Sequence, residues 1–160
     1  MEDVRSNVPT GGPRSAASLR QWGPAVDVAV MVHRREAAAV VAAGRAVAPP
    51  VAGRAIIDTG SSTTAISFDT AARLRLDPVG EMEVGTGTDI VRAPTFAFSI
   101  AFTALETTLD FESAPGLPVA RPGQVAIVGR DVLAGALFSY DGPRGVASLE
   151  FKGGPPERHA

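Results

Sequence analysis

The sequence predicts an all-β barrel with a few short helices. Three observations favour this class: short segments in which apolar residues alternate with other residues, frequent Gly and Pro between those segments, and few stretches with helical spacing. The chain has 160 residues, 45% of them hydrophobic, which suits one domain with its own core. We expect a disordered tail over residues 1–21, a folded domain over residues 22–152 and a flexible tail over residues 153–160, because both tails are rich in Gly and Pro and lack periodicity.

The first part of the folded domain is predicted to combine strands with two short helices. Every second residue is Val in residues 26–31, the pattern of a half-buried strand. Residues 34–43 are rich in Ala and other good helix formers, and Gly44 then ends the helix. Further along, Ser67 is expected to cap a second short helix that closes at Leu74.

The second part is predicted to consist of strands and hairpins. Residues 82–84 and 90–92 flank a Gly-rich hairpin tip, made of Gly85, Thr86, Gly87 and Thr88. Two glycines could also suggest phosphate binding, but the strand-to-helix context of such loops does not follow. Alternating residues predict strands at 95–102 and 107–111, and a last hairpin is expected to turn at residues 141–145.

The most informative short segment is the turn that begins at Asp58. The apolar run at residues 55–57 ends directly before it, so a buried strand would deliver the carboxylate into a turn with Thr59, Gly60 and Ser61. A strand fixes the position of an acid, glycine allows a close backbone approach, and hydroxyl groups can orient the carboxylate for general acid/base chemistry. An isolated Asp-Thr-Gly also forms ordinary turns.

A second segment repeats this design. The apolar residues 125–128 run into Gly129, and a brief stretch with helical spacing follows, with Gly135 at the position expected just after a helix. The two segments therefore predict a faint internal duplication, strand-turn-helix each time. Here the acid is Asp131, which is expected to cap or charge the N-terminus of the short helix.

The two segments resemble the motifs of the retropepsin-like aspartic proteases, the family of the retroviral proteases and their bacterial single-domain relatives. Residues 56–61 match the motif of two hydrophobic residues, Asp-Thr-Gly and Ala or Ser. Residues 127–133 match the later motif of two hydrophobic residues, Gly-Arg-Asp/Asn, a hydrophobic residue and Leu. Residues 138–151 resemble the closing hairpin of the bacterial members, so the resemblance covers about residues 22–152. It implies an aspartic endopeptidase that hydrolyses polypeptides without a cofactor.

The resemblance also implies a homodimer. The chemistry needs two carboxylates that share a proton, and this chain has a single Asp-Thr-Gly. Asp58 of each subunit would then meet its counterpart at a two-fold axis. By the family's pattern, Thr59 would bond to the partner's backbone, Gly60 would bring its N–H close to the carboxylates, and Ser61 could donate to the outer oxygen of Asp58.

The second motif and the hairpin tip take supporting roles in this comparison. Gly129 would pack against the catalytic turn, and Arg130 would be a buried structural cation. Retroviral members often pair that arginine with an acid where this chain has Ser62, so the partner of Arg130 is not identified. The tip at residues 85–88 would be the flap that closes over substrate. The helix at residues 34–43 departs from the retroviral pattern, which has a tight hairpin there.

Composition excludes several other classes of protein. The formal net charge is −2 and the 15 basic residues are scattered, so we expect neither a nucleic-acid nor a membrane partner. The chain has no Cys, and His33 and His159 are far apart in sequence, which argues against metal sites and a Ser/His/Asp triad. Asp89 and Asp110 are expected to be exposed. With no apolar run of membrane-spanning length and no basic-then-apolar N-terminus, we expect a soluble, cytoplasmic protein.

Three functions remain open from the sequence. The first is a dimeric aspartic endopeptidase. The second is a non-catalytic dimeric module of the same fold that binds peptides or supports assembly. The third is a monomeric β domain in which the Asp-Thr-Gly at Asp58 is only a turn. Solution mass separates the third from the others, because a monomer cannot bring two Asp58 side chains together.

Overall fold

The computed structural model describes residues 15–119 and 121–151. Its strands are β1 (Ala25–Val32), β2 (Val51–Ile57), β3 (Ala65–Ser67), β4 (Gly80–Gly85), β5 (Ile90–Phe102), β6 (Thr107–Leu117), β7 (Gln124–Val128), β8 (Ala136–Asp141) and β9 (Val146–Phe151). Its helices are α1 (Ala16–Trp22), α2 (Arg34–Ala42), α3 (Phe68–Arg73), the 3₁₀ helix η1 (Thr103–Leu105) and α4 (Arg130–Leu133).

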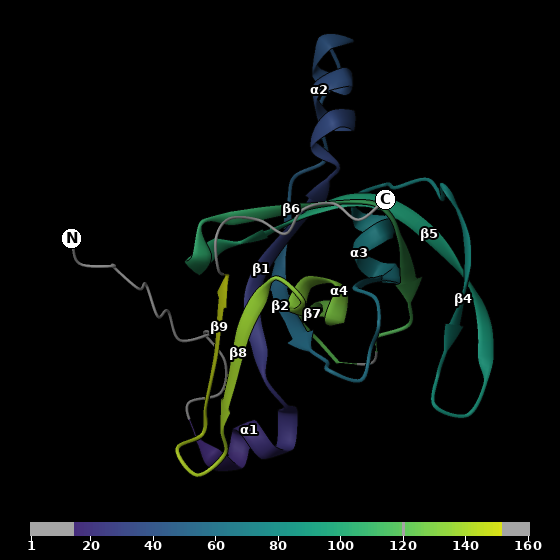
Figure 1. The fold of residues 1–160 in the computed structure, drawn as a ribbon. Coiled ribbons are helices and arrows are strands. Elements are labelled where there is room, and N and C mark those ends of the chain that lie inside the picture. The colour runs from purple at the N-terminus through teal and green to yellow at the C-terminus, as the bar shows by residue number, and fades with distance from the viewer. Residues whose placement is uncertain (1–14, 120, 152–160) are drawn as a thin grey trace.

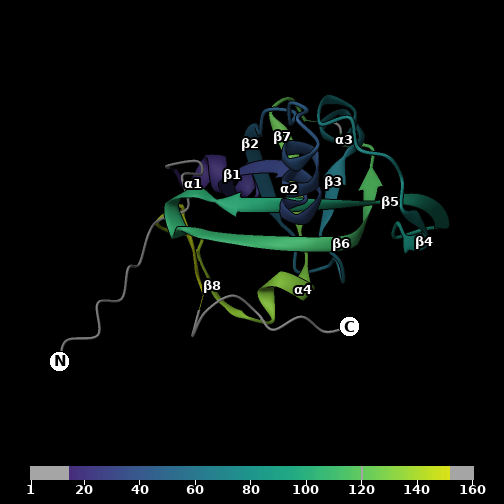
Figure 2. The ribbon, with the colours of Figure 1, turned by 90° about the horizontal axis from the view of Figure 1, so that it is seen from above.

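Six strands close into a barrel, which confirms the predicted all-β barrel class. The order is β1-β2-β7-β3-β6-β5, and β5 pairs back to β1. The long strand β5 also continues beyond the barrel, where it pairs with β4. Seen from above, β5 and β6 run along one side of the barrel, with α1 near one end and β4 at the other (Figure 2).

The core fills the barrel, and the alternation in β1 places Val side chains in it. Val26, Val28 and Val30 are buried while Asp27 is exposed, as the sequence pattern predicts. Residues of β5 and β6 add aromatic rings to the same core, and apolar burial of this kind is the main favourable term in folding.

The β8–β9 hairpin is a separate two-stranded sheet beside the barrel (Figure 1). Its turn lies where the sequence predicts it, with Asp141 opposite Val146. Leu149 is fully buried, and the ring of Phe151 meets that of Phe102 edge-on, with 5.3 Å between the ring centroids. These contacts attach the hairpin to the barrel core.

The helix ends follow the expected capping chemistry. The Thr70 N–H donates to the Ser67 hydroxyl oxygen over 3.0 Å, so Ser67 caps α3, and Leu74 is the residue that closes the helix. Gly44, just beyond α2, has a φ of +69° in the left-handed region that favours glycine.

Helix α2 projects from the barrel (Figure 1), and none of its residues is buried. Its base is fixed by ion pairs. The Arg34 guanidinium donates to both oxygens of Asp110 on β6, over 2.8 and 2.7 Å, and the Ser99 hydroxyl donates to the same carboxylate over 2.7 Å. The expectation that Asp110 is exposed is therefore wrong, since its side chain is 9% exposed. The hydrogen bond from Arg34 lowers the pKa of Asp110 to about 2.

The predicted N-terminal tail extends too far. Ala16–Trp22 form a helix in the structure. The Ser15 hydroxyl caps this helix by accepting from the Ser18 N–H, and Leu19 is buried. Burial of Leu19 and a hydrogen bond from the Arg121 Nη1 to the Trp22 carbonyl oxygen attach this segment, although its composition resembles that of disordered chains. Residues 1–14 and 152–160 lie outside the described residues, and the tails expected for them stay predictions. Within the described ranges, no helix is both long and apolar enough to cross a membrane.

Candidate active site at the Asp58 turn

Strands β2 and β7 are parallel neighbours in the barrel, and they place the two sequence motifs side by side. Ile57 lies opposite Val128, and the Asp58 N–H continues the ladder by donating to the Val128 carbonyl oxygen over 3.0 Å. Ile57 is buried, whereas Asp58 is exposed. The strand is half-buried and not fully buried as the sequence predicts, because Ala52 and Arg54 on β2 are exposed. Its buried end at Ile57 nevertheless presents the Asp58 carboxylate to solvent.

The Asp58 carboxylate is oriented by its own turn. The Gly60 N–H donates to Oδ1 of Asp58 over 2.8 Å, and the Ser61 N–H donates to the Asp58 carbonyl oxygen over 3.2 Å. A Cβ at residue 60 would lie 3.1 Å from Oδ1, so glycine allows this close approach. Within the described chain no other side chain bonds to the carboxylate, and it is accessible to a water molecule or a ligand.

In the described chain Ser61 has a different hydrogen-bond partner from the one expected. Its hydroxyl donates to the Thr63 carbonyl oxygen over 2.7 Å and does not bond to Asp58. Serine side chains in turns commonly donate to a backbone carbonyl close in sequence, as here. Thr59 is exposed, and in the described part of the chain its hydroxyl has no hydrogen-bond partner. Its bond to a second subunit stays a prediction.

Arg130 stabilises the turn, but it is exposed and not buried as expected. Its Nη1 donates to the carbonyl oxygens of Thr59 and Gly60, over 2.9 and 3.0 Å, and its backbone N–H donates to the Ser61 carbonyl oxygen over 2.9 Å. The missing acid at Ser62 therefore leaves no buried unpaired charge. Backbone carbonyls and solvent satisfy the guanidinium instead.

The second motif packs tightly against the segment after Asp58. A Cβ at residue 129 would lie 2.5 Å from the Thr63 carbonyl carbon, so only glycine fits, as expected for Gly129. The Asp131 carboxylate accepts from the Thr64 N–H, over 2.9 and 3.0 Å, and from the Thr64 hydroxyl over 2.7 Å. It also accepts from the Val132 N–H over 2.9 Å, which agrees with its predicted place at the start of a helix.

Thr64 is a supporting residue that the sequence analysis missed. It is fully buried, and its hydroxyl oxygen accepts from the Gly129 N–H over 3.1 Å while its proton goes to Asp131. The available signal was a polar residue directly before the apolar strand β3. The predicted duplication also holds only in part, because β3 intervenes between the Asp58 turn and α3, whereas β7 leads directly into α4.

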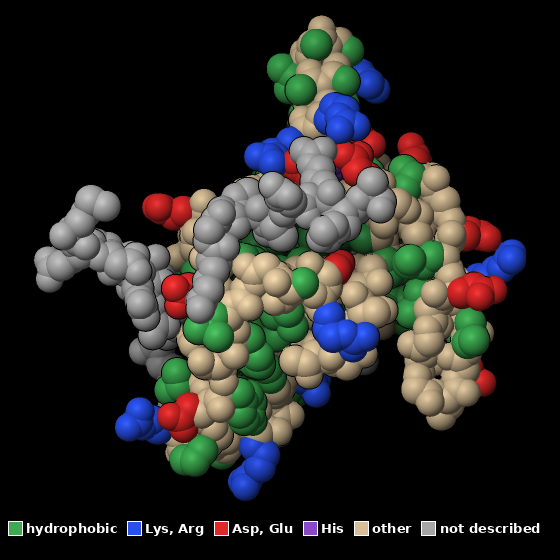
Figure 3. Space-filling model, viewed as in Figure 1, with side chains coloured by type: hydrophobic (Ala, Val, Ile, Leu, Met, Phe, Trp, Pro, Cys, Tyr) green, Lys and Arg blue, Asp and Glu red, His purple; other side chains and the backbone are tan. Residues whose placement is uncertain are grey.

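The predicted Gly-rich hairpin is present as β4–β5, and its role as a flap stays a prediction. In the strand register Glu83 lies opposite Arg92, and the tip is closed by the Thr86 N–H, which donates to the Asp89 carbonyl oxygen over 2.8 Å. Gly87 has a φ of +73°, and Asp89 is exposed as expected. In Figure 3 the hairpin stands away from the body at the lower right, with open space on its inner side. Among the described residues, no hydrogen bond joins the tip to the Asp58 turn.

The described residues contain no group of three or more His, Cys, Asp or Glu side chains that could hold a metal ion. No protein-family model matches the chain, and no curated protein matches it either. The fold and the site thus define a β-barrel domain that exposes one oriented carboxylate, at Asp58, on a turn tied to a second motif by Arg130. The family resemblance rests on these two motifs.

Proposed function

We propose that the protein is an aspartic endopeptidase that acts as a homodimer. The observation that carries the proposal is the Asp58 turn: a carboxylate at the end of the barrel strand β2, oriented by the Gly60 N–H over 2.8 Å, in a turn whose carbonyls accept hydrogen bonds from Arg130. Acid/base catalysis requires a carboxylate in a fixed position, and these backbone and side-chain hydrogen bonds fix the turn that carries Asp58.

One Asp58 cannot perform the reaction, so the proposal needs a second chain. Asp58, Thr59 and Gly60 are all exposed in the single chain, which leaves the turn available to a two-fold partner. In such a dimer two carboxylates share one proton, because like charges at short range cannot both ionise.

The reaction then follows from the two protonation states. The ionised carboxylate accepts a proton from a water molecule as the water oxygen attacks the peptide carbonyl carbon, and the protonated carboxylate donates to the carbonyl oxygen. Collapse of the tetrahedral intermediate breaks the C–N bond as the nitrogen takes up a proton. The products are a carboxylic acid and an amine, and the dyad returns to sharing one proton.

The β4–β5 hairpin supports a polypeptide as the substrate. An extended peptide can add to exposed strand backbone, and the two glycines near the tip, Gly85 and Gly87, allow the hairpin to reshape. The alternative is a dimeric module that binds peptides without cleaving them, and it predicts the same dimer without turnover.

The test combines mass and turnover. Sedimentation at micromolar concentration should give twice the chain mass, and digestion of a peptide library should yield new amino termini that Asp58→Asn does not produce. A strict monomer, even with a transition-state-like peptide inhibitor present, would reject the proposal. A dimer that binds peptides without cleaving them would favour the non-catalytic module.

A further inference from the structure

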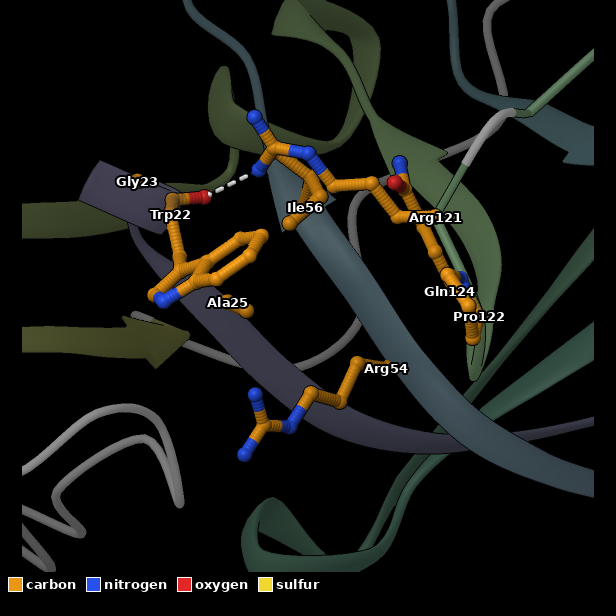
Figure 4. Close-up of a pocket in the computed structure, with 8 residues that line it drawn as sticks. All are labelled: Trp22, Gly23, Ala25, Arg54, Ile56, Arg121, Pro122 and Gln124. Carbon is orange, nitrogen blue, oxygen red and sulfur yellow. Dashed lines mark hydrogen bonds between the residues drawn. The ribbon is translucent and has the colours of Figure 1, made fainter. Parts of the chain in front are cut away.

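A pocket of about 260 Å³ lies between the end of α1 and the strands β1, β2 and β7. The residues that form it come from three separate stretches of the chain, and Figure 4 shows their side chains around a common open space. The residues used in the argument are Trp22, Ala25, Arg54, Ile56, Arg121 and Gln124.

Two guanidinium groups border this pocket. The Arg121 guanidinium is positioned by Trp22: its Nη1 donates to the Trp22 carbonyl oxygen over 2.7 Å, and its central carbon lies 5.4 Å from the centre of the indole ring. Arg54 has its nearest acid, Asp27, at 4.0 Å, which is beyond hydrogen-bond distance. Both arginines therefore keep N–H groups that a ligand can use.

The rest of the pocket is apolar, with one neutral polar side chain. Trp22 forms one wall and is 47% exposed, while Ala25 and Ile56 supply apolar surface and Gln124 an amide. None of the residues that line the pocket is acidic, and the nearby Asp27 carries one negative charge against two guanidinium groups, which leaves a positive excess. The matching ligand is a carboxylate on a short apolar stem, and the volume is below that of pockets for drug-sized molecules.

The pocket also lies close to the candidate active site. Ile56 on β2 precedes Asp58, the residue directly after the strand, by two positions, and the residue between them, Ile57, is buried in the core. Residues two apart on a strand face the same side and are about 7 Å apart. An extended peptide laid past Asp58 on that side would therefore place a nearby side chain at the pocket.

We propose that this pocket binds the acidic side chain of an extended polypeptide, with Arg54 and Arg121 holding the carboxylate. The inference deepens the proposed endopeptidase function and rests on it for its consequence. That consequence is a preference for peptides with Glu or Asp within about two residues of the cleaved bond.

Binding can be tested apart from cleavage, because Trp22 is the only tryptophan of the chain. In an Asp58→Asn background, a capped hexapeptide with one Glu is titrated against the same peptide with Gln, and tryptophan fluorescence is followed. We expect the Glu peptide to bind about tenfold tighter, since one charge-assisted hydrogen bond contributes on that scale. The difference should shrink with added salt.

Variants assign the effect to the pocket. Arg54→Gln and Arg121→Gln should each remove most of the preference for Glu. Arg73→Gln is the matched control, because Arg73 is 59% exposed against 51% for Arg54 and is also 4.0 Å from an acid, but lies on α3 outside the pocket. The thermal midpoint of each variant checks that the fold is retained, and Arg121→Lys tests whether charge alone is sufficient.

Equal binding of the Glu and Gln peptides, or an unchanged preference in both arginine variants, would overturn the proposal. Free N-acetylglutamate that competes as strongly as the peptide would overturn the assignment to polypeptide. The Glu preference without cleavage by the wild type would support the pocket and reject the endopeptidase. Cleavage without any acidic preference would reject the pocket and leave the endopeptidase standing.

Discussion

The two strand-turn motifs, at Asp58 and at Asp131, have similar sequences, but their carboxylates differ in the number of hydrogen bonds they accept. β2 and β7 lie side by side and each runs into a turn that carries an aspartate. The Asp58 carboxylate receives one hydrogen bond, from its own turn, whereas the Asp131 carboxylate accepts from the Thr64 N–H, the Thr64 hydroxyl and the Val132 N–H. A carboxylate bonded to several internal donors is committed to structure, and one with a free oxygen remains available for chemistry.

The sharpest test of this difference replaces each aspartate by its isosteric amide. Asp58→Asn should lower peptide cleavage at least about a thousandfold and leave the thermal midpoint within a few degrees, because the carboxylate has few internal partners. Asp131→Asn should lower the free energy of unfolding by about 1–3 kcal/mol, because an amide cannot accept all of these hydrogen bonds. Turnover assays and thermal unfolding on both variants measure the contrast. If Asp131→Asn were stable but inactive while Asp58→Asn remained active, Asp131 would be the catalytic residue and Asp58 the structural one.

The glycines of the two motifs offer the next contrast. Gly129→Ala should cost about 3 kcal/mol of unfolding free energy, because the new Cβ would lie 2.5 Å from the Thr63 backbone. Gly60→Ala should cost clearly less, since the only atom within 4 Å of its Cβ, at 3.1 Å, is an Asp58 carboxylate oxygen in an exposed turn. Urea unfolding of the two variants gives both values. Similar losses would mean that the two turns are packed alike.

A third carboxylate, that of Asp110, makes the stability of the fold depend on pH. Its pKa falls from 3.8 to about 2 in the folded chain, so its stabilisation is fully present above about pH 4 and is lost as the pH falls through 2. At neutral pH it should amount to about 1–2 kcal/mol, less than the full shift implies because Arg34 is largely exposed. Thermal midpoints of wild type and Asp110→Asn should therefore differ above pH 4 and converge near pH 2. Asp77→Asn, at an exposed position, should show no such convergence.

The smallest expected effect belongs to Arg130, which links the two motifs. Arg130→Ala should cost about 1 kcal/mol, because the Thr59 and Gly60 carbonyls it releases are exposed and can bond to water. The affinity of the dimer should fall together with the stability, since the Asp58 turn loses the hydrogen bonds from Arg130. Calorimetry and sedimentation measure the two quantities. A variant with unchanged melting and unchanged dimerisation but reduced turnover would show that Arg130 contacts substrate.

The sequence by itself determined the local features of this protein. The alternating valines of β1, the Ser67 cap, the stop at Gly44 and the hairpin turn before Val146 all depend on residues within a few positions of one another. Such features follow from backbone propensity, side-chain period and capping, which act over one or two turns. The Asp58 and Gly129 motifs were found in the same way.

Only the tertiary structure decided which groups meet across the barrel. Arg130 reaches the Thr59 carbonyl across 71 positions of sequence, and Asp131 bonds to Thr64 across 67. Contacts of this range depend on strand order and register, and these decided that Arg130 is exposed and that the pocket beside Trp22 forms from three segments. A one-residue change of register would turn each side chain to the opposite face, so no local pattern could have specified these contacts.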